Sequence, residues 1–375
     1  MGKAKEPTDH KGREKVQCRE CGLWFHRLDV HISSKHSGVE DYKKKFPGAP
    51  LLSETAKRSA GESGSEDVFK FGVARLSMRD DLDEYDEKFV AKHDEQWELG
   101  VDEREALEAL SLAIEDNENV LIVGPPGVGK STLVKELSAI CNHPLRRTSF
   151  RGDMRASDLV GKGRLTVDDG SGQSITDYMG GILPDASERG HWLLIDEFDS
   201  GPAEIMFILF PVLEDERSLI LLGKDGGYQV SFDDNFRFIA TANTLGFGDE
   251  SGLYAGTAPI NEALLDRFHT VITMKYPERD NEIKRIVKKS GIDKEQADKM
   301  VAIATKVREA QTRDETTASL SPRRLIMWAR KTVRMGDVRR AARYTITNRL
   351  PSDESVYVEG IIQRYFGGSP VTPTP

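Results

Sequence analysis

The sequence predicts an α/β fold with a parallel sheet flanked by helices, followed by an α-helical domain and preceded by a small zinc-finger-like module. Five short apolar runs alternate with helical patterns through the middle of the chain, which is typical of a parallel sheet. Apolar residues three or four apart dominate the C-terminal part, as in packed helices. Near the N-terminus, Cys18 and Cys21 have the spacing of metal ligands.

The five expected strands are apolar runs of a length typical of buried strands. They lie at residues 119–123, 145–150, 191–196, 236–243 and 270–276. Two β-hairpin insertions are expected between them, because "RLTV" and "QSIT" flank the turn signal "DDGSG", and "SLILLG" and "YQVSF" flank "KDGG". Both hairpins are placed to push or grip a client molecule when the nucleotide state changes; the alternative is that each is only a surface ornament.

These patterns divide the chain into five parts. Residues 1–50 form the metal module, and the Ser-, Gly- and charge-rich stretch 51–67 is expected to be a flexible linker. Residues 68–276 form the α/β domain and 277–368 the α-helical domain. The tail 369–375 is expected to be disordered.

Charge is distributed unevenly along the 375 residues, whose net charge is −9. Residues 1–60 carry thirteen Lys and Arg against eight Asp and Glu, a net of +5, whereas residues 61–120 carry six against nineteen, a net of −13. A basic N-terminal module suits contact with nucleic acid or an acidic protein, although such residues are commonly just solvated.

Nothing in the sequence resembles a membrane span or a secretory signal, and the chain has three cysteines. We therefore expect a soluble cytoplasmic protein without a disulfide framework. Cys141 is expected to be an ordinary buried thiol.

The stretch "GPPGVGKST" has the composition of a phosphate-binding loop. Its glycines let backbone N–H groups surround a phosphate chain, its lysine adds positive charge, and its first hydroxyl can bind magnesium. A strand precedes it and a helix follows, as the motif requires. The expected nucleotide contacts are Gly124, Pro125, Pro126, Gly127, Val128, Gly129, Lys130, Ser131 and Thr132.

Further polar residues stand where parallel strands end. Asp196 is placed to hold magnesium together with Ser131, and Glu197 to polarise the water that attacks the terminal phosphate. Asn243, at the tip of a later strand, is suited to orient that water or sense the phosphate. Two arginines complete the set: Arg267 suggests a group supplied to a neighbouring subunit, and Arg323, beside Arg324, begins a helix of the C-terminal domain.

Cys18, Cys21, His31 and His36 have a spacing that can close a tetrahedron around zinc. Phe25 and Leu28 are expected to form the small core of this module. The short interval between the ligand pairs resembles zinc fingers of the bacterial Ros/MucR type. Such modules bind DNA or protein, and the sequence leaves both open.

The order of phosphate loop, acidic pair, Asn-tipped strand and two arginines resembles the AAA+ ATPases. Within them, "DEFDSGPAEIMFILFPVLE" (196–214) and "SPRRLIMWARKTVRMGDV" (321–338) resemble the MoxR group and, most closely, the small subunits of aerobic cobaltochelatases (CobS-like). The resemblance covers roughly residues 68–368. The zinc module is foreign to those subunits.

This resemblance implies an ATP- and magnesium-dependent enzyme that forms a hexameric ring, with a partner containing a von Willebrand factor A domain. Three functions stay open: a motor that remodels a protein, a chelatase subunit for cobalt insertion into a corrin ring, and a DNA-directed protein recruited by the zinc finger. In each, Glu197, Asn243, Arg267 and Arg323 are the expected catalytic residues.

Overall fold

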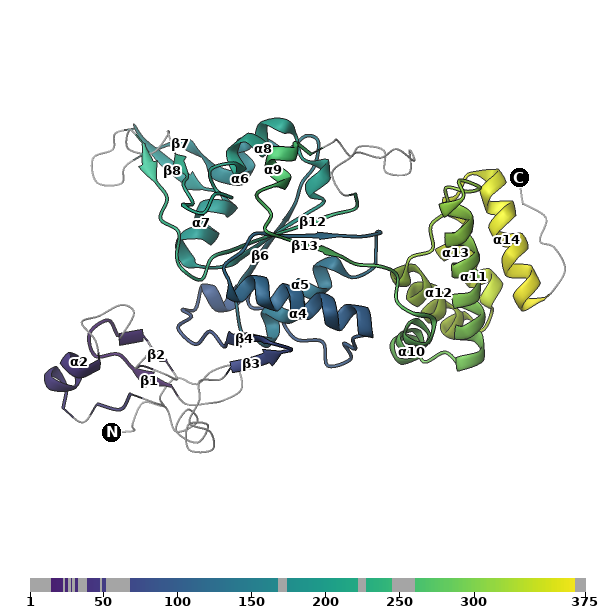
Figure 1. The fold of residues 1–375 in the computed structure, drawn as a ribbon, viewed down its shortest axis with the longest axis horizontal. Helices are drawn as coiled ribbons and strands as arrows, with labels where there is room; N and C mark the ends of the chain where they lie inside the picture. The colour runs from purple at the N-terminus through teal and green to yellow at the C-terminus, as the bar shows by residue number, and fades with distance from the viewer. Residues whose placement is uncertain are drawn as a thin grey trace.

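The structure is a computed structural model with a central α/β unit, a helical unit on one side and a small N-terminal module (Figure 1). It describes residues 15–22, 24–25, 28, 31–32, 39–47, 49–51, 68–167, 174–221, 227–244 and 260–367. The tail 369–375 and nearly all of the expected linker 51–67 lie outside these residues.

Five parallel strands form the central sheet in the order β13-β5-β12-β9-β6. They are β5 (Val120–Val123), β6 (Leu145–Ser149), β9 (Trp192–Asp196), β12 (Arg237–Ala242) and β13 (Thr270–Thr273). Each strand lies within one of the five runs expected from the sequence, so the predicted parallel sheet is confirmed.

Helices cover both faces of this sheet (Figure 1). The helices of the unit are α4 (Val101–Glu115), α5 (Lys130–Ile140), α6 (Ala156–Val160), α7 (Ile182–Arg189), α8 (Ala203–Leu209) and α9 (Glu262–Leu265). Alternate side chains of β5 enter opposite cores: Val120 and Ile122 pack with α4 and α5, whereas Leu121 and Val123 pack with α7 and α8. Burial on both faces explains why the strands are continuously apolar.

An antiparallel pair, β3 (Val68–Phe71) and β4 (Ala74–Ser77), packs beside α4. Leu76 of β4 is buried in the same core as Leu107 and Leu110 of α4. The sequence patterns did not single out this pair, because it follows directly on the polar linker.

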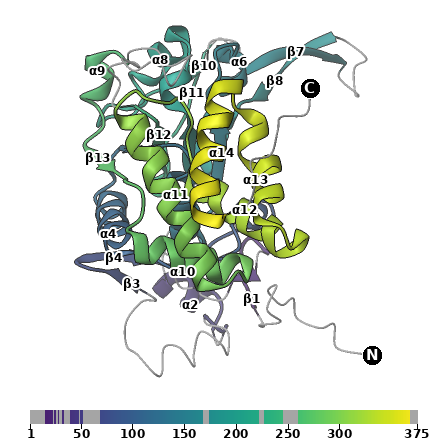
Figure 2. The ribbon, with the colours of Figure 1, turned by 90° about the vertical axis from the view of Figure 1, so that its right-hand side faces the viewer.

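Both expected hairpin insertions are present. The longer one pairs β7 (Gly161–Val167) with β8 (Ser174–Gly180), follows α6 and projects from the α/β unit (Figures 1 and 2). At its base, a Cβ on Gly161 would lie 2.3 Å from the carbonyl oxygen of Met179, and one on Gly181 would lie 2.2 Å from that of Leu159. The shorter hairpin pairs β10 (Ile220–Leu221) with β11 (Tyr228–Gln229).

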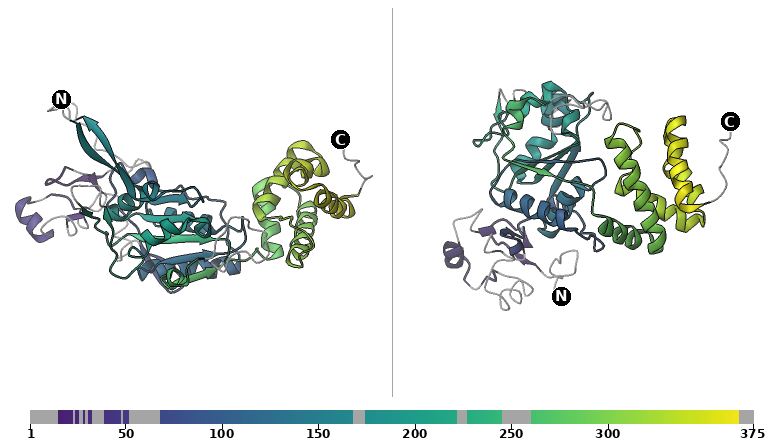
Figure 3. Two further views of the ribbon diagram at one scale, coloured as in Figure 1. Left: turned by 90° about the horizontal axis from the view of Figure 1, so that it is seen from above. Right: turned by 45° about the vertical axis from the view of Figure 1, so that its right-hand side comes forward.

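The C-terminal unit consists of packed helices (Figures 2 and 3). They are α10 (Arg279–Ser290), α11 (Lys294–Thr312), α12 (Pro322–Met335), α13 (Val338–Thr345) and α14 (Ser352–Phe366). The buried Trp328 lies in their core and donates to the carbonyl oxygen of Val338 at 2.8 Å. Among the described residues, no helix is both long and apolar enough to cross a bilayer.

In the N-terminal module, β1 (Val16–Gln17) pairs antiparallel with β2 (Trp24–Phe25), and α2 (Val39–Lys45) follows. Phe25 and Leu28 are buried together with Cys18, Ile32 and Tyr42, which confirms the expected small core.

Candidate functional site

The loop 124–132 joins β5 to α5 in a conformation that its glycines permit. Gly124, Gly127 and Gly129 have φ angles of 158°, 74° and 115°, which are unfavourable for other residues. A Cβ on Gly124 would also lie 2.3 Å from the carbonyl oxygen of Met274. Because α5 begins at Lys130, its N-terminus is at the loop, an arrangement that favours an anion.

Lys130 is buried at the base of this loop. Its Nζ donates to the carbonyl oxygens of Gly124 at 2.5 Å and Pro125 at 3.3 Å, and to Oδ1 of Asn243 at 3.0 Å. Burial lowers the pKa of Lys130 to about 8, although the nearby Asp199 and other carboxylates oppose the shift. The structure thus brings together the lysine and the asparagine that the sequence predicted for one site.

Asp196, the last residue of β9, accepts hydrogen bonds from three side chains. The donors are the hydroxyl of Ser131, the hydroxyl of Thr241 at 2.8 Å and Nε of Arg147 at 2.5 Å. The two residues expected to hold magnesium are therefore in direct contact, and their hydroxyl and carboxylate oxygens suit that ion. The next residue, Glu197, is exposed and has a left-handed φ of 54°.

Asp199 is a buried member of the site that the sequence analysis did not identify. Its Oδ2 accepts hydrogen bonds from the backbone N–H of Asn243 at 2.9 Å and from both the N–H and the hydroxyl of Thr244, at 3.0 and 3.1 Å. Its Oδ1 is buried without a hydrogen-bond partner among the described residues. The stretch "DEFD" (196–199) contains a third acidic residue after Asp196 and Glu197, and this pattern could have indicated Asp199.

The start of α12 lies against the phosphate loop. Ser321 caps this helix and Pro322 is its first residue, which are favourable choices at those positions. A Cβ added to Gly127 would be 2.8 Å from the Ser321 side chain and 3.6 Å from Cβ of Arg323. Arg324 instead donates to the carbonyl oxygen of Thr345 inside the helical unit at 3.2 Å. Of the two arginines, Arg323 is therefore the one beside the loop.

Arg267 is not part of this cluster. It precedes β13 and contacts Glu214, and Asn119 donates to its carbonyl oxygen at 3.0 Å. Asn119 precedes β5, whereas the phosphate loop follows β5. Arg267 therefore lies near the end of β5 where that strand begins, whereas the phosphate loop of the same subunit lies at the other end of β5.

Two family models match the chain. The AAA domain (dynein-related subfamily) matches residues 119–268, and the CbbQ/NirQ/NorQ C-terminal family matches residues 282–363. The aerobic cobaltochelatase subunit CobS of a Sinorhizobium species is 36% identical over 270 residues, which are 71% of this chain and 80% of that protein. This chain belongs to the AAA+ ATPases of the MoxR and CobS type.

Membership makes the protein an ATP-hydrolysing enzyme that uses ATP and magnesium, and members of this type typically form oligomeric rings. The uncharacterized protein YojN of Bacillus subtilis is 32% identical over 165 residues, 44% of this chain and 50% of its own length. The solved structure of the RuvB Holliday junction branch migration motor of Thermotoga maritima aligns with 70% of this AAA+ chain and 68% of its own. Its sequence identity is 16% and its TM-score 0.42.

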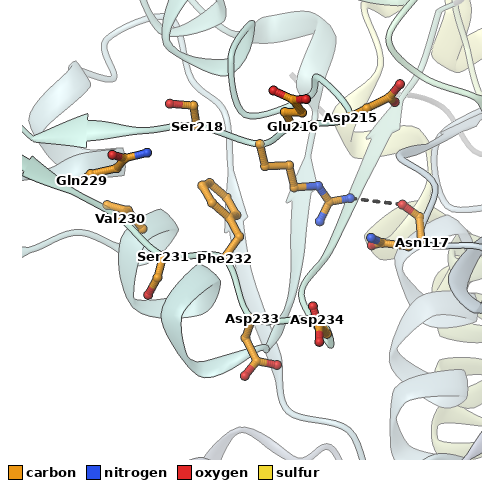
Figure 4. Close-up of a pocket in the computed structure, with 11 residues that line it drawn as sticks. Asn117, Asp215, Glu216, Ser218, Gln229, Val230, Ser231, Phe232, Asp233 and Asp234 are labelled. Carbon is orange, nitrogen blue, oxygen red and sulfur yellow. Dashed lines mark hydrogen bonds between the residues drawn. The ribbon is translucent and has the colours of Figure 1, made fainter.

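A polar cavity of about 580 Å³ lies where strands β5 and β12 begin, at the opposite end of β5 from the phosphate loop (Figure 4). Asn117, Glu216, Arg217 and Asp234 are among its lining residues. Arg217 donates to the carbonyl oxygens of Phe236 and Asn117 at 3.1 and 3.2 Å, and burial lowers its pKa to about 10. These carbonyl groups compensate the guanidinium, so it has a structural role at this end of the sheet.

Three of the four expected zinc ligands come together in the N-terminal module of this AAA+ protein. The ligand atoms of Cys18, Cys21 and His31 lie within 4.8 Å of one another. His31 stacks on Phe25 with ring centroids 4.1 Å apart, which fixes the imidazole. Two thiols and an imidazole suit zinc. The fourth expected ligand, His36, lies outside the described residues.

The helix α2 carries three lysines in its last turn, Lys43, Lys44 and Lys45. Lys45 pairs with Glu20 at 2.7 Å and Lys44 with Asp41 at 3.5 Å. Two of these three lysines are thus paired with carboxylates of the module itself.

Proposed function

We propose that this AAA+ ATPase is the subunit of a hexameric ring motor that remodels a protein partner. The observation that carries this proposal is the position of Arg267. The side chain of Asn119 donates a hydrogen bond to the backbone carbonyl oxygen of Arg267, and β5 separates Asn119 from the phosphate loop. From residue 119 to residue 124 an extended chain covers about 16 Å, at 3.3 Å per residue. Arg267 is therefore suited to act on the nucleotide of a neighbouring subunit.

Within one subunit, the phosphate loop and Lys130 bind the phosphates of ATP. Ser131 and Asp196 hold magnesium, which when bound neutralises phosphate charge. Glu197 polarises the attacking water, and Asn243 orients it while contacting Lys130. The neighbouring subunit supplies Arg267, which stabilises the charge that develops on the terminal phosphate.

The helical unit responds to the nucleotide through two features. Arg323 lies beside the phosphate loop, and a cavity of about 570 Å³ opens between Pro125 of that loop, Tyr276 and the helices α10 and α11. We assign this cavity to the nucleoside part of ATP. Hydrolysis and release then change the contact between the helical unit and the α/β unit, and the movement reaches the hairpins.

The partner is a protein with a von Willebrand factor A domain, contacted through the β7–β8 and β10–β11 hairpins. The N-terminal module holds zinc through Cys18, Cys21, His31 and His36 and directs the ring to its target. The pairing of Lys44 and Lys45 with carboxylates favours a protein target over DNA.

Mixed rings test the shared active site. Arg267→Ala and Glu197→Gln subunits should each be inactive alone, and mixing them should restore part of the hydrolysis wherever an intact site forms between two subunits. Failure to rescue at every mixing ratio would contradict a trans role for Arg267.

A trap experiment tests the remodelling function. Tagged Glu197→Gln protein with ATP should retain its partners in native cell lysate, and a von Willebrand factor A-domain protein should be among them. Recovery of DNA instead, lost when residues 1–60 are removed, would favour the DNA-directed alternative.

The second candidate is a cobaltochelatase subunit, favoured by the identity to CobS. This function requires a large subunit that binds the corrin ring. Recovery of such a subunit in the same trap, together with ATP-dependent cobalt insertion, would support it over general protein remodelling.

A further inference from the structure

We propose that Glu214 is a positioning residue for Arg267, and that Asn119 fixes the backbone on which both residues stand. The inference rests on the proposed function, in which Arg267 completes the ATP site of a neighbouring subunit. It assigns a role to two residues that lie outside the phosphate loop and outside the Ser131–Asp196 pair.

The hydrogen bonds of the Arg267 guanidinium define its orientation. Nε donates to Oε1 of Glu214 at 2.9 Å, Nη2 donates to the same oxygen, and Nη1 donates to the carbonyl oxygen of Ala263. A guanidinium has five N–H donors, so these three bonds leave one N–H on each terminal nitrogen. These two N–H groups are available to donate to the oxygens of a phosphate.

The pair stands at the surface, where another subunit can reach it. The side chains of Arg267 and Glu214 are 26% and 51% exposed. The guanidinium lies over the ring of Phe210, 4.7 Å from its centroid, and Phe210 stacks on Phe207, which is 66% exposed. The aromatic ring supports one face of the guanidinium and Glu214 fixes its rotation in that plane.

Asn119 links the backbone segments that carry Glu214 and Arg267. It is buried, and its Nδ2 donates to the carbonyl oxygens of both Leu213 and Arg267, at 2.8 and 3.0 Å. Nη2 of Arg217 donates to its Oδ1 at 3.3 Å. Asn119 comes directly before β5, the strand that leads to the phosphate loop. The Asn119 side chain and strand β5 thus connect the phosphate loop of one subunit to the arginine proposed to act on the nucleotide of the neighbouring subunit.

An exposed ion pair contributes little to folding stability. Removing the Glu214 carboxylate should therefore leave the fold intact and release the guanidinium into other rotamers. Misplacement of a catalytic group by about 1 Å can reduce turnover roughly 100-fold. We expect Glu214→Gln to lower ATP hydrolysis by the ring roughly 10- to 100-fold. Its melting temperature and its ATP affinity should match the wild type, because the subunit binds ATP through its own phosphate loop.

The decisive test is the complementation class of Glu214→Gln. Mixed with Glu197→Gln subunits it should regain hydrolysis, and mixed with Arg267→Ala subunits it should not. Glu216→Gln, the same change two residues away at an exposed carboxylate, should remain fully active. Wild-type turnover of both Glu214→Gln and Glu214→Ala would overturn the inference, as would rescue of Glu214→Gln by Arg267→Ala.

The outcome separates this inference from the function on which it rests. If Arg267→Ala and Glu197→Gln subunits do not complement each other, the trans-acting arginine itself is wrong. If they complement each other while Glu214→Gln and Glu214→Ala both hydrolyse ATP normally, only the positioning role of Glu214 is refuted.

Discussion

Replacing Asp199 by Asn tests whether a buried carboxylate fixes the end of β12, with Asn243 and Thr244 after it, to the phosphate site. Oδ2 of Asp199 accepts three hydrogen bonds from Asn243 and Thr244, so the change turns three bonds to a charged acceptor into bonds to a neutral one. Each such exchange costs about 1 kcal/mol, or about 3 kcal/mol together. For a unit of this size, the melting temperature should fall by about 6–12 °C.

The same substitution should also weaken nucleotide binding. Asp199 is the first of the carboxylates that oppose the lowering of the Lys130 pKa to about 8. Without this carboxylate the pKa of Lys130 falls further, so less of the lysine is charged at pH 7 and its attraction for phosphate decreases.

Calorimetry and titration with a fluorescent ATP analogue measure the two effects. Asp153→Asn provides the matched control, because Asp153 is highly exposed and its change should alter neither. If Asp199→Asn kept the melting temperature within about 2 °C of the wild type and bound the analogue equally well, the reasoning would be refuted.

The remaining predictions concern three parts of the chain. Lys130→Ala should abolish ATP binding in the same titration, and retained affinity would contradict the phosphate-loop assignment. Zinc chelation or Cys18→Ser should unfold only the first fifty residues, seen as loss of the module's NMR signals, with ATP hydrolysis retained. Burial holds the pKa of His143 well below 6.5, so only the unfolded chain binds its proton as the pH falls below that value. The unfolding free energy should therefore drop by up to about 1.4 kcal/mol per pH unit below about 6.5. His143→Gln should make this slope shallower in urea unfolding, and an unchanged slope would exclude His143 as its cause.

Local patterns were sufficient to predict the sheet and the two hairpins, and to select Lys130 and Asn243, whose side chains the structure brings together. Strands such as β9 are apolar throughout because both faces are buried, and this is visible in a single run of residues. The phosphate loop could also be predicted from the sequence, because its backbone has positive φ angles at positions that therefore favour glycine.

Interactions between distant segments could not be predicted in this way. Asn119 and Arg267 are 148 positions apart, and Glu214 is 53 positions from Arg267. The sequence places Asn119 at the start of an expected strand, and nothing around it indicates that its side chain binds the backbone at Leu213 and Arg267.

The glycine-packed base of the β7–β8 hairpin has a mechanical consequence. At Gly161 and Gly181 the backbone at the base of the hairpin packs so closely that neither position has room for a side chain. The seven residues of β7 extend about 20 Å beyond it, at 3.4 Å per residue. Over that length, a rotation of about 10° at α6 would correspond to a displacement of about 3.5 Å at the far end of the hairpin. The reach of the hairpin, and with it the displacement that a given rotation produces, is set by how many residues its strands contain.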